Sequence, residues 1–169
     1  MNKTSEKEEG EEGVLKNTGI LNLKDITEEE LEHLKKIKNV GILIVPKNLM
    51  GRISAKIENV GVVIPYEEGM RIYSGESKLN ADVLKSLEEP MGIINAGKLI
   101  IEKNTPAELI TEKIKEIKNY GKILVPKQAY GALMSRVSEN TGKIEILEKV
   151  IEEKIKELEK ELGELRESK

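Results

Sequence analysis

Short aliphatic runs recur along the chain, and each of them follows the tripeptide Asn-x-Gly. The runs cover residues 20–23, 42–45, 62–64, 98–101, 122–125 and 143–147. Runs of this length, rich in Ile and Val and introduced by turn residues, are typical of short buried parallel strands. The turn residues of the six tripeptides are Asn17, Gly19, Asn39, Gly41, Asn59, Gly61, Asn95, Gly97, Asn119, Gly121, Asn140 and Gly142.

The spacing of the glycines predicts a repeat protein. Four of the five intervals are 20 to 24 residues long, which is enough for one strand and one short helix, whereas the interval from Gly61 to Gly97 is 36 residues. Such periods are typical of solenoids. We expect an α/β fold, a right-handed solenoid of about six short parallel strands alternating with short helices over residues 14–147. The long interval predicts an insertion in the third coil.

Turn chemistry gives a reason for the tripeptide. Asn tolerates the left-handed conformation that ends a helix, and Gly permits a tight turn into the next strand. Stacked Asn side chains can also bond neighbouring backbone. We expect three prolines that follow aliphatic runs to end their strands, because proline cannot donate the next ladder hydrogen bond; they are Pro46, Pro65 and Pro126.

A longer repeat indicates that a two-coil unit is duplicated, since residues 17–61 recur as 95–142 with their signals in the same order. Thr27 with Glu30, and Thr105 with Glu108, predict equivalent capping boxes, the second with Pro106 at the first helical position. The apolar face expected behind these helix starts comprises Leu31, Leu34 and Ile37 in one copy and Leu109, Ile110, Lys113, Ile114 and Ile117 in the other.

The pattern Leu31-x-x-Leu34-x-x-Ile37-x-Asn39, followed by Gly41 and an aliphatic run, resembles the bacterial leucine-rich repeat. The resemblance covers residues 14–147 and implies a binding scaffold with a continuous strand face, without catalytic residues. In that family the asparagine follows the strand leucines, whereas here it precedes the strand. A distinct β/α solenoid is therefore an equally good interpretation.

The 36-residue interval is the least repetitive stretch, and it carries residue types that often anchor interfaces. We take its candidate partner-binding residues to be Tyr66, Glu67, Arg71, Tyr73 and Lys78, with a short helix starting near Asn80. The alternative is a longer connection whose Tyr rings cover the edge of a coil.

The two ends of the chain differ from the repeats. Residues 1–13 are mostly charged and are expected to be a disordered acidic tail. Residues 148–169 predict an amphipathic helix whose heptad-like seam either caps the last coil or forms a coiled coil. The candidate oligomerisation residues on this seam are Ile151, Ile155, Leu158, Leu162 and Leu165.

Composition narrows the possible chemistry. The chain lacks Cys, has the single histidine His33, and carries a net charge of -3, so thiol catalysis, a histidine cluster and general attraction for nucleic acid are not expected. We found no phosphate-binding loop or nucleophile motif, and predict no enzyme activity, no cofactor and no metal site. No apolar run is long enough for a signal or membrane span, which favours a cytoplasmic location.

These observations leave three functional hypotheses. The first is a non-catalytic scaffold that binds a protein partner of unknown identity. The alternative is a self-assembling structural protein, which forms oligomers or filaments through stacked coils or the C-terminal helix. A small-ligand sensor or enzyme is the third.

Overall fold

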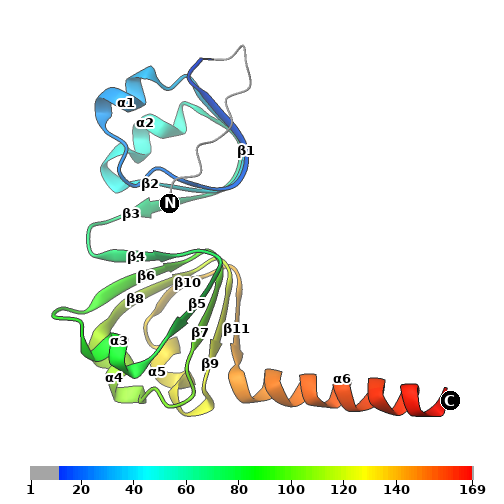
Figure 1. Cartoon of the computed structure of the whole chain (residues 1–169). Coiled ribbons are helices and arrows are strands. Elements are labelled where there is room, and N and C mark those ends of the chain that lie inside the picture. Colours follow the sequence, from blue (N-terminus) through cyan, green and yellow to red (C-terminus); the bar gives the residue numbers. More distant parts are fainter. Residues whose placement is uncertain (1–11, 169) are drawn as a thin grey trace. The chain divides into compact units, whose positions relative to one another are not determined.

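The computed structural model describes residues 12–168 and divides the chain into two compact units, Met1–Glu68 (unit 1) and Gly69–Lys169 (unit 2). Each unit is a stack of parallel strand-and-helix coils (Figure 1). The expected α/β repeat fold with a long C-terminal helix is therefore confirmed. Most of the predicted acidic tail, residues 1–13, lies outside the described residues.

Unit 1 contains one parallel sheet in the order β1-β2-β3, with two helices packed against it. Its buried residues form one cluster that includes Leu31, Ile37, Leu43 and Ile53. The strands are long because each runs through its Asn-x-Gly tripeptide. The elements are β1 (Val14–Asn22), α1 (Glu28–His33), β2 (Lys36–Pro46), the 3-10 helix η1 (Lys47–Leu49), α2 (Met50–Ser54) and β3 (Ile57–Tyr66).

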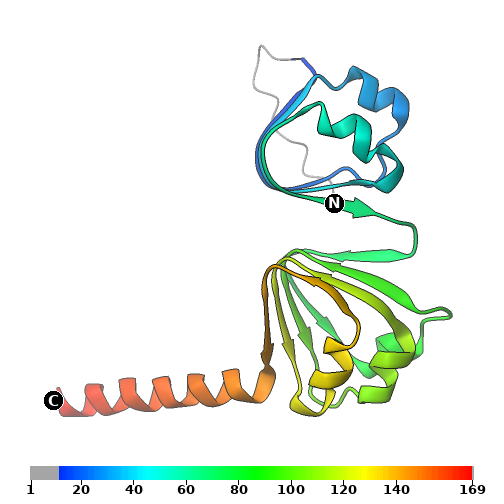
Figure 2. The same ribbon diagram turned by 180° about the vertical axis from the view of Figure 1, so that it is seen from behind.

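Unit 2 contains two parallel sheets, in the orders β4-β6-β8-β10 and β5-β7-β9-β11. The two sheets meet along one corner, and α3, α4 and α5 lie on the side opposite this corner (Figures 1 and 2). The elements are β4 (Met70–Tyr73), β5 (Glu76–Leu79), α3 (Ala81–Lys85), β6 (Met91–Asn95), β7 (Lys98–Ile101), α4 (Ala107–Lys113), β8 (Ile114–Asn119), β9 (Lys122–Val125), η2 (Lys127–Ala129), α5 (Tyr130–Met134), β10 (Val137–Asn140), β11 (Lys143–Ile146) and α6 (Leu147–Glu167).

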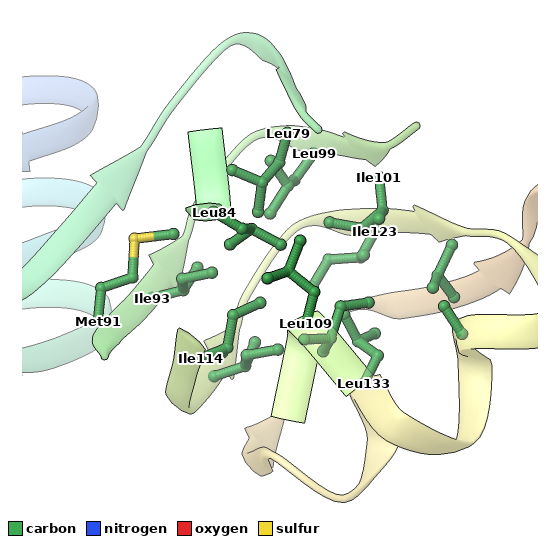
Figure 3. Packing of buried hydrophobic residues seen from close by; sticks show 14 residues of the cluster. Leu79, Leu84, Met91, Ile93, Leu99, Ile101, Leu109, Ile114, Ile123 and Leu133 are labelled. Carbon is green, nitrogen blue, oxygen red and sulfur yellow. The ribbon is translucent and has the colours of Figure 1, made fainter. Parts of the chain in front are cut away.

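The buried core of unit 2 consists of Ile, Leu, Val and Ala side chains with the single methionine Met91. Figure 3 shows Leu99 and Ile123 from the strands pointing toward Leu84, Leu109 and Leu133 from the helices. All five side chains are buried. Thin layers of Ile and Leu of similar size fill such a repeated interior, which explains how the chain forms its core without Phe or Trp.

Each coil of unit 2 contains two strands, whereas the sequence predicted one. The aliphatic runs form the second strand of each coil, and the residues before Asn form the first. Ile37, Ile114 and Ile117, predicted on helix faces, lie in strands β2 and β8. The interpretation failed at β8 because a register irregularity lets residues three apart, Ile114 and Ile117, both be buried, which imitates a helical period.

The 36-residue interval is not an insertion. Its residues 70–79 form β4 and β5, which pair in parallel with β6 and β7 as a complete further layer. Tyr73 occupies the register position of Asn95, and Gly75 lies 22 residues before Gly97. The Asn-x-Gly pattern did not predict this coil, because Tyr73-Ser74-Gly75 has Tyr where the other coils have Asn.

The duplicated unit is confirmed by its helices. Both copies have a three-residue 3-10 helix followed by a five-residue α-helix. The separate prediction of a short helix near Asn80 is also confirmed, because α3 begins after Asn80, whose side chain accepts a hydrogen bond from Val83 N. Strands end at Pro46 and before Pro126 as predicted. Pro65 does not end its strand, because β3 continues through it to Tyr66.

Only one of the two predicted capping boxes supplies a side-chain cap. Thr27 Oγ1 accepts a hydrogen bond from Glu30 N at 3.1 Å. In the second copy the helix begins one residue later, with Pro106 as the N-cap, and the buried Thr105 hydroxyl has no partner within the described residues. The second capping prediction is therefore wrong.

Basic side chains close the helix ends, a feature that sequence reasoning missed. Lys113 Nζ donates to Leu87 O at 2.7 Å, and Arg136 Nη2 donates to Thr111 O at 2.6 Å. In unit 1, Lys56 Nζ donates to Leu31 O and Leu34 O at 2.6 and 2.7 Å. Each cation thus reaches back to carbonyl groups near the C-terminal end of the preceding helix, where the helix dipole favours positive charge.

Removing this contact in unit 1 should weaken the unit. We expect Lys56→Met to lower the free energy of unfolding by about 2 kcal/mol, because two part-buried carbonyl groups lose a charged donor. Urea unfolding followed by circular dichroism measures the change. The exposed Lys35 supplies the control. Equal stability of Lys56→Met and Lys35→Met would show that the carbonyl contacts contribute nothing.

Candidate interaction surface

The asparagines of unit 2 form a buried ladder at the corner between its sheets. Asn95 Nδ2 donates to Asn119 Oδ1, and Asn119 Nδ2 donates to Asn140 Oδ1, both at 2.9 Å. Asn119 Nδ2 also approaches Gly121 O and Lys143 O at 3.1 and 3.2 Å. Asn95 and Asn119 are fully buried. They satisfy polar backbone groups inside the stack, so this corner is a structural feature.

Unit 1 has a matching asparagine ladder, but its side chains are exposed and its backbone conformation differs from that of unit 2. Asn59 Nδ2 donates to Asn39 Oδ1 at 2.8 Å, and Asn39 Nδ2 donates to Asn17 Oδ1 at 3.2 Å. These three asparagines have positive φ values between 54° and 59°. The predicted left-handed conformation is thus present here, but it lies within strands. The prediction that it ends a helix is wrong.

The glycines of the tripeptide are needed for close packing between coils. A Cβ atom at Gly121 would lie 2.0 Å from Gly97 O, and one at Gly142 would lie 1.9 Å from Gly121 O. In unit 1, a Cβ atom added at Gly41 would lie 2.8 Å from Gly19 O. Real side chains do not approach a carbonyl so closely. The glycine therefore repeats because successive backbones nearly touch at the corner.

The five candidate partner-binding residues are divided between the two units. In unit 1, the Tyr66 ring lies 5.5 Å from Lys24 Nζ, and Glu67 forms an ion pair with Lys47. In unit 2, Tyr73 packs against the core cluster. Arg71 and Lys78 lie exposed on β4 and β5. The residues thus belong to regular strands or strand ends, and their role in binding stays a prediction.

The last strands of unit 2 are short and charged. β10 and β11 have four residues each, and they carry Glu139, Lys143 and Glu145. Tyr120 donates its hydroxyl to Glu139 Oε2 at 2.7 Å; burial and this bond raise the pKa of Tyr120 above its usual range. Short strands with charged side chains are how proteins prevent edge-to-edge pairing. This edge is therefore poorly suited to coil stacking.

Helix α6 carries five of the seven large hydrophobic side chains that are exposed among the described residues. It runs 21 residues, and none of them is buried. We define the α6 stripe as Ile151, Ile155, Leu158, Leu162 and Leu165, whose exposed fractions lie between 48% and 63%. Steps of four and three residues place these side chains on one face. The predicted oligomerisation residues therefore share one exposed helix face.

Only the first turn of α6 is anchored to the coils. Glu148 Oε2 accepts a hydrogen bond from Lys127 N at 2.7 Å, and Leu147 and Val150 are half-buried. A groove beside the helix is lined by Lys103, Ile151 and Ile155, among other residues. Beyond this turn the helix has no packing within unit 2 that buries a side chain, and most helices depend on such packing for stability.

The described residues lack a clustered metal site and a membrane-spanning helix. Residues 12–168 contain no group of three or more His, Asp or Glu side chains arranged to hold a metal ion. Across the same residues, no helix has the length and apolar character required to cross a membrane.

Comparison with known proteins gives no family for this chain. No protein-family model matches it, and searches of curated proteins and of solved structures returned no significant match. The parallel sheets and repeating strand-helix units agree with the general architecture that the leucine-rich-repeat resemblance implied, without identifying that family. Function must therefore be argued from the surfaces of the chain itself, among which the α6 stripe is the candidate interaction surface.

Proposed function

We propose that the protein is a non-catalytic repeat scaffold that acts through protein–protein contacts, and that self-association through the α6 stripe is one of these contacts. The observation that carries the proposal is the row of five half-exposed Ile and Leu side chains on one helix face. Burying a Leu or Ile side chain contributes about 1.5–3 kcal/mol. A partner surface on this face would therefore stabilise the helix substantially.

The charged strands at the C-terminal edge favour the helix over the coils as the point of assembly. Lys122 on β9 and Glu145 on β11 form an ion pair, so charged side chains lie at this edge of the sheet. End-to-end stacking of coils would have to accommodate these side chains. An oligomer formed by helices avoids that problem and leaves the outer faces of the coils accessible.

Alanine substitutions in the stripe test the proposal. We expect Ile155→Ala, Leu158→Ala and Leu162→Ala together to convert the self-associated protein into a monomer of 18.9 kDa. Each truncation removes about 2 kcal/mol or more from a packed interface. Because alanine favours helix, the substitutions themselves do not disfavour α6. Light scattering coupled to gel filtration gives the mass.

The matched control changes the outer face of the same helix. Glu153→Ala, Glu157→Ala and Lys160→Ala together also introduce three alanines, but at exposed charged positions. This variant should keep the mass of the unmodified protein. Equal masses for the two triple variants would contradict self-association through the stripe.

The scaffold proposal also includes binding of a protein partner other than a second copy of this chain. Arg71 on β4 and Lys78 on β5 are the two basic residues among the five candidates, and both are exposed on unit 2. We propose this region for such a partner, in keeping with the role of Arg at interfaces. Arg71→Ala with Lys78→Ala should reduce binding without changing the mass of the self-associated protein.

A further inference from the structure

The charges beside the α6 stripe specify how two helices pair. In heptad notation the stripe places Ile155 and Leu162 at a positions and Ile151, Leu158 and Leu165 at d positions. The flanking e positions are then Glu152, Glu159 and Arg166, and the flanking g positions include Lys154 and Glu161. These e and g residues decide partner and orientation in coiled coils.

From this pattern we infer that α6 forms a parallel, in-register, two-stranded coiled coil with α6 of a second copy of this chain. The inference rests on the proposed self-association and adds its geometry. In a parallel pair each g residue faces the e residue five positions later in the partner. Lys154 then faces Glu159 of the second copy, and Glu161 faces Arg166 of the second copy, so that both contacts join unlike charges.

The four residues are available for these contacts. No ion pair between described residues engages Lys154, Glu159, Glu161 or Arg166. Between described residues, the helix forms one ion pair, which joins Lys156 to Glu152 at 3.5 Å and lies outside the pairs described above. The charges that would orient the pair are thus not committed to contacts within the monomer.

Antiparallel pairing places like charges opposite each other in each register that aligns the stripe, whereas the parallel pair has none. Where Ile155 meets Leu158 of the partner, Glu152 faces Glu159, and this repulsion offsets the attraction between Lys154 and Glu161. In the register one heptad along, where Leu158 meets Leu162, Glu161 faces Glu161 of the second copy, and this repulsion offsets the attraction between Glu152 and Arg166. Moving the other way, Lys154 faces Lys154. Like charges at these flanking positions are how natural coiled coils exclude wrong partners and orientations.

The central layer of the seam favours two strands, because Ile155 at a followed by Leu158 at d is the combination typical of parallel dimers. Ile151 at d and Leu162 at a do not follow this combination, so the sedimented mass decides the number of strands. About three heptads make a weak coil by themselves, so we expect dimerisation to be reversible and concentration-dependent. In a parallel pair both copies of unit 2 attach to the same end of the coil, which presents two scaffolds to one partner and raises avidity.

Single cysteines test the orientation, because the natural chain contains none. We propose Ile151→Cys and Leu162→Cys, each oxidised alone and as a mixture of the two full-length variants. In a parallel pair equal positions meet, so each variant cross-links to itself. Positions 151 and 162 are separated by about 16 Å along a helix, beyond the span of a disulfide. The mixture should therefore contain almost no mixed disulfide.

The possible results separate the inference from the proposed function. Predominantly mixed cross-links would show antiparallel helices and overturn the inference while leaving self-association intact. A dimer that forms neither product would place the contact elsewhere and overturn the parallel pair. Sedimentation of the unmodified chain and of the reduced variants, run in parallel, reports association itself; a monomer in every sample would remove the proposed function as well.

A charge exchange tests the flanking pairs independently. Lys154→Glu should weaken dimerisation about tenfold, because two attractive contacts per dimer become repulsive. Adding Glu159→Lys restores unlike charges and should return the dissociation constant to within about threefold of its original value. Lys160→Glu makes the same change in net charge on the outer face and serves as the control. Failure of the second substitution to rescue the first would contradict the parallel pairing.

Discussion

Gly121→Ala is expected to lower the free energy of unfolding of unit 2 by about 3 kcal/mol or more. The new methyl group would lie 2.0 Å from Gly97 O and 3.0 Å from Gly97 C and N. All three atoms belong to the backbone of the preceding coil, so no side chain can rotate away. The coils would have to separate at the corner, which would disturb the hydrogen bonds that β7 and β9 form with each other.

The conformation at Gly121 is one that alanine can adopt, because its φ is not in the left-handed region. The expected loss therefore comes from the contact and not from backbone strain. Gly131→Ala is the matched control, since Gly131 lies in α5 with no atom within 4 Å of the added Cβ. It should be neutral or slightly stabilising. Hydrogen exchange in residues 98–125 measures both, and unchanged protection in Gly121→Ala would contradict the close packing.

Asn119→Ala should have a similarly large effect. Asn119 accepts hydrogen bonds from Asn95 Nδ2 and Gly121 N, and its own amide donates to Asn140 Oδ1 and to carbonyl groups. The residue is fully buried. Its loss leaves several buried polar groups without partners, and each such group costs about 1–3 kcal/mol. We expect a total destabilisation of about 3–5 kcal/mol.

The last step of the same ladder provides a matched control. Asn140 is exposed and accepts a single hydrogen bond from Asn119. Asn140→Ala should therefore cost about 1 kcal/mol or less. Urea unfolding of the two variants gives the difference. Equal losses would mean that burial of the ladder does not determine its contribution.

The fold class was predictable because the same backbone contact recurs in every coil. Close approach of coils requires glycine at positions such as Gly97 and Gly121, and their spacing reveals the period. The apolar seam of α6 was predictable because the spacing of apolar residues along a helix determines which of them share a face. The sequence therefore predicted that the five apolar residues from Ile151 to Leu165 lie on one face, as the structure shows.

Other features depend on contacts that no single repeat reveals. Tyr73 takes the position of an asparagine in the first layer of unit 2, so a search for Asn-x-Gly passes over that coil. Ile114 and Ile117 are both buried because of an irregular strand register, which a helical pattern also explains. Lys113 lies among apolar residues in the sequence, but its ammonium group bonds to a carbonyl of the preceding coil.

Sedimentation equilibrium of the unmodified chain over a range of concentrations tests the central claim most directly. Self-association through α6 predicts a mass that rises from 18.9 kDa toward twice that value, and a chain truncated after Leu147 that stays monomeric. A single mass of 18.9 kDa at all concentrations, or a truncated chain that associates as strongly as the full one, would contradict it.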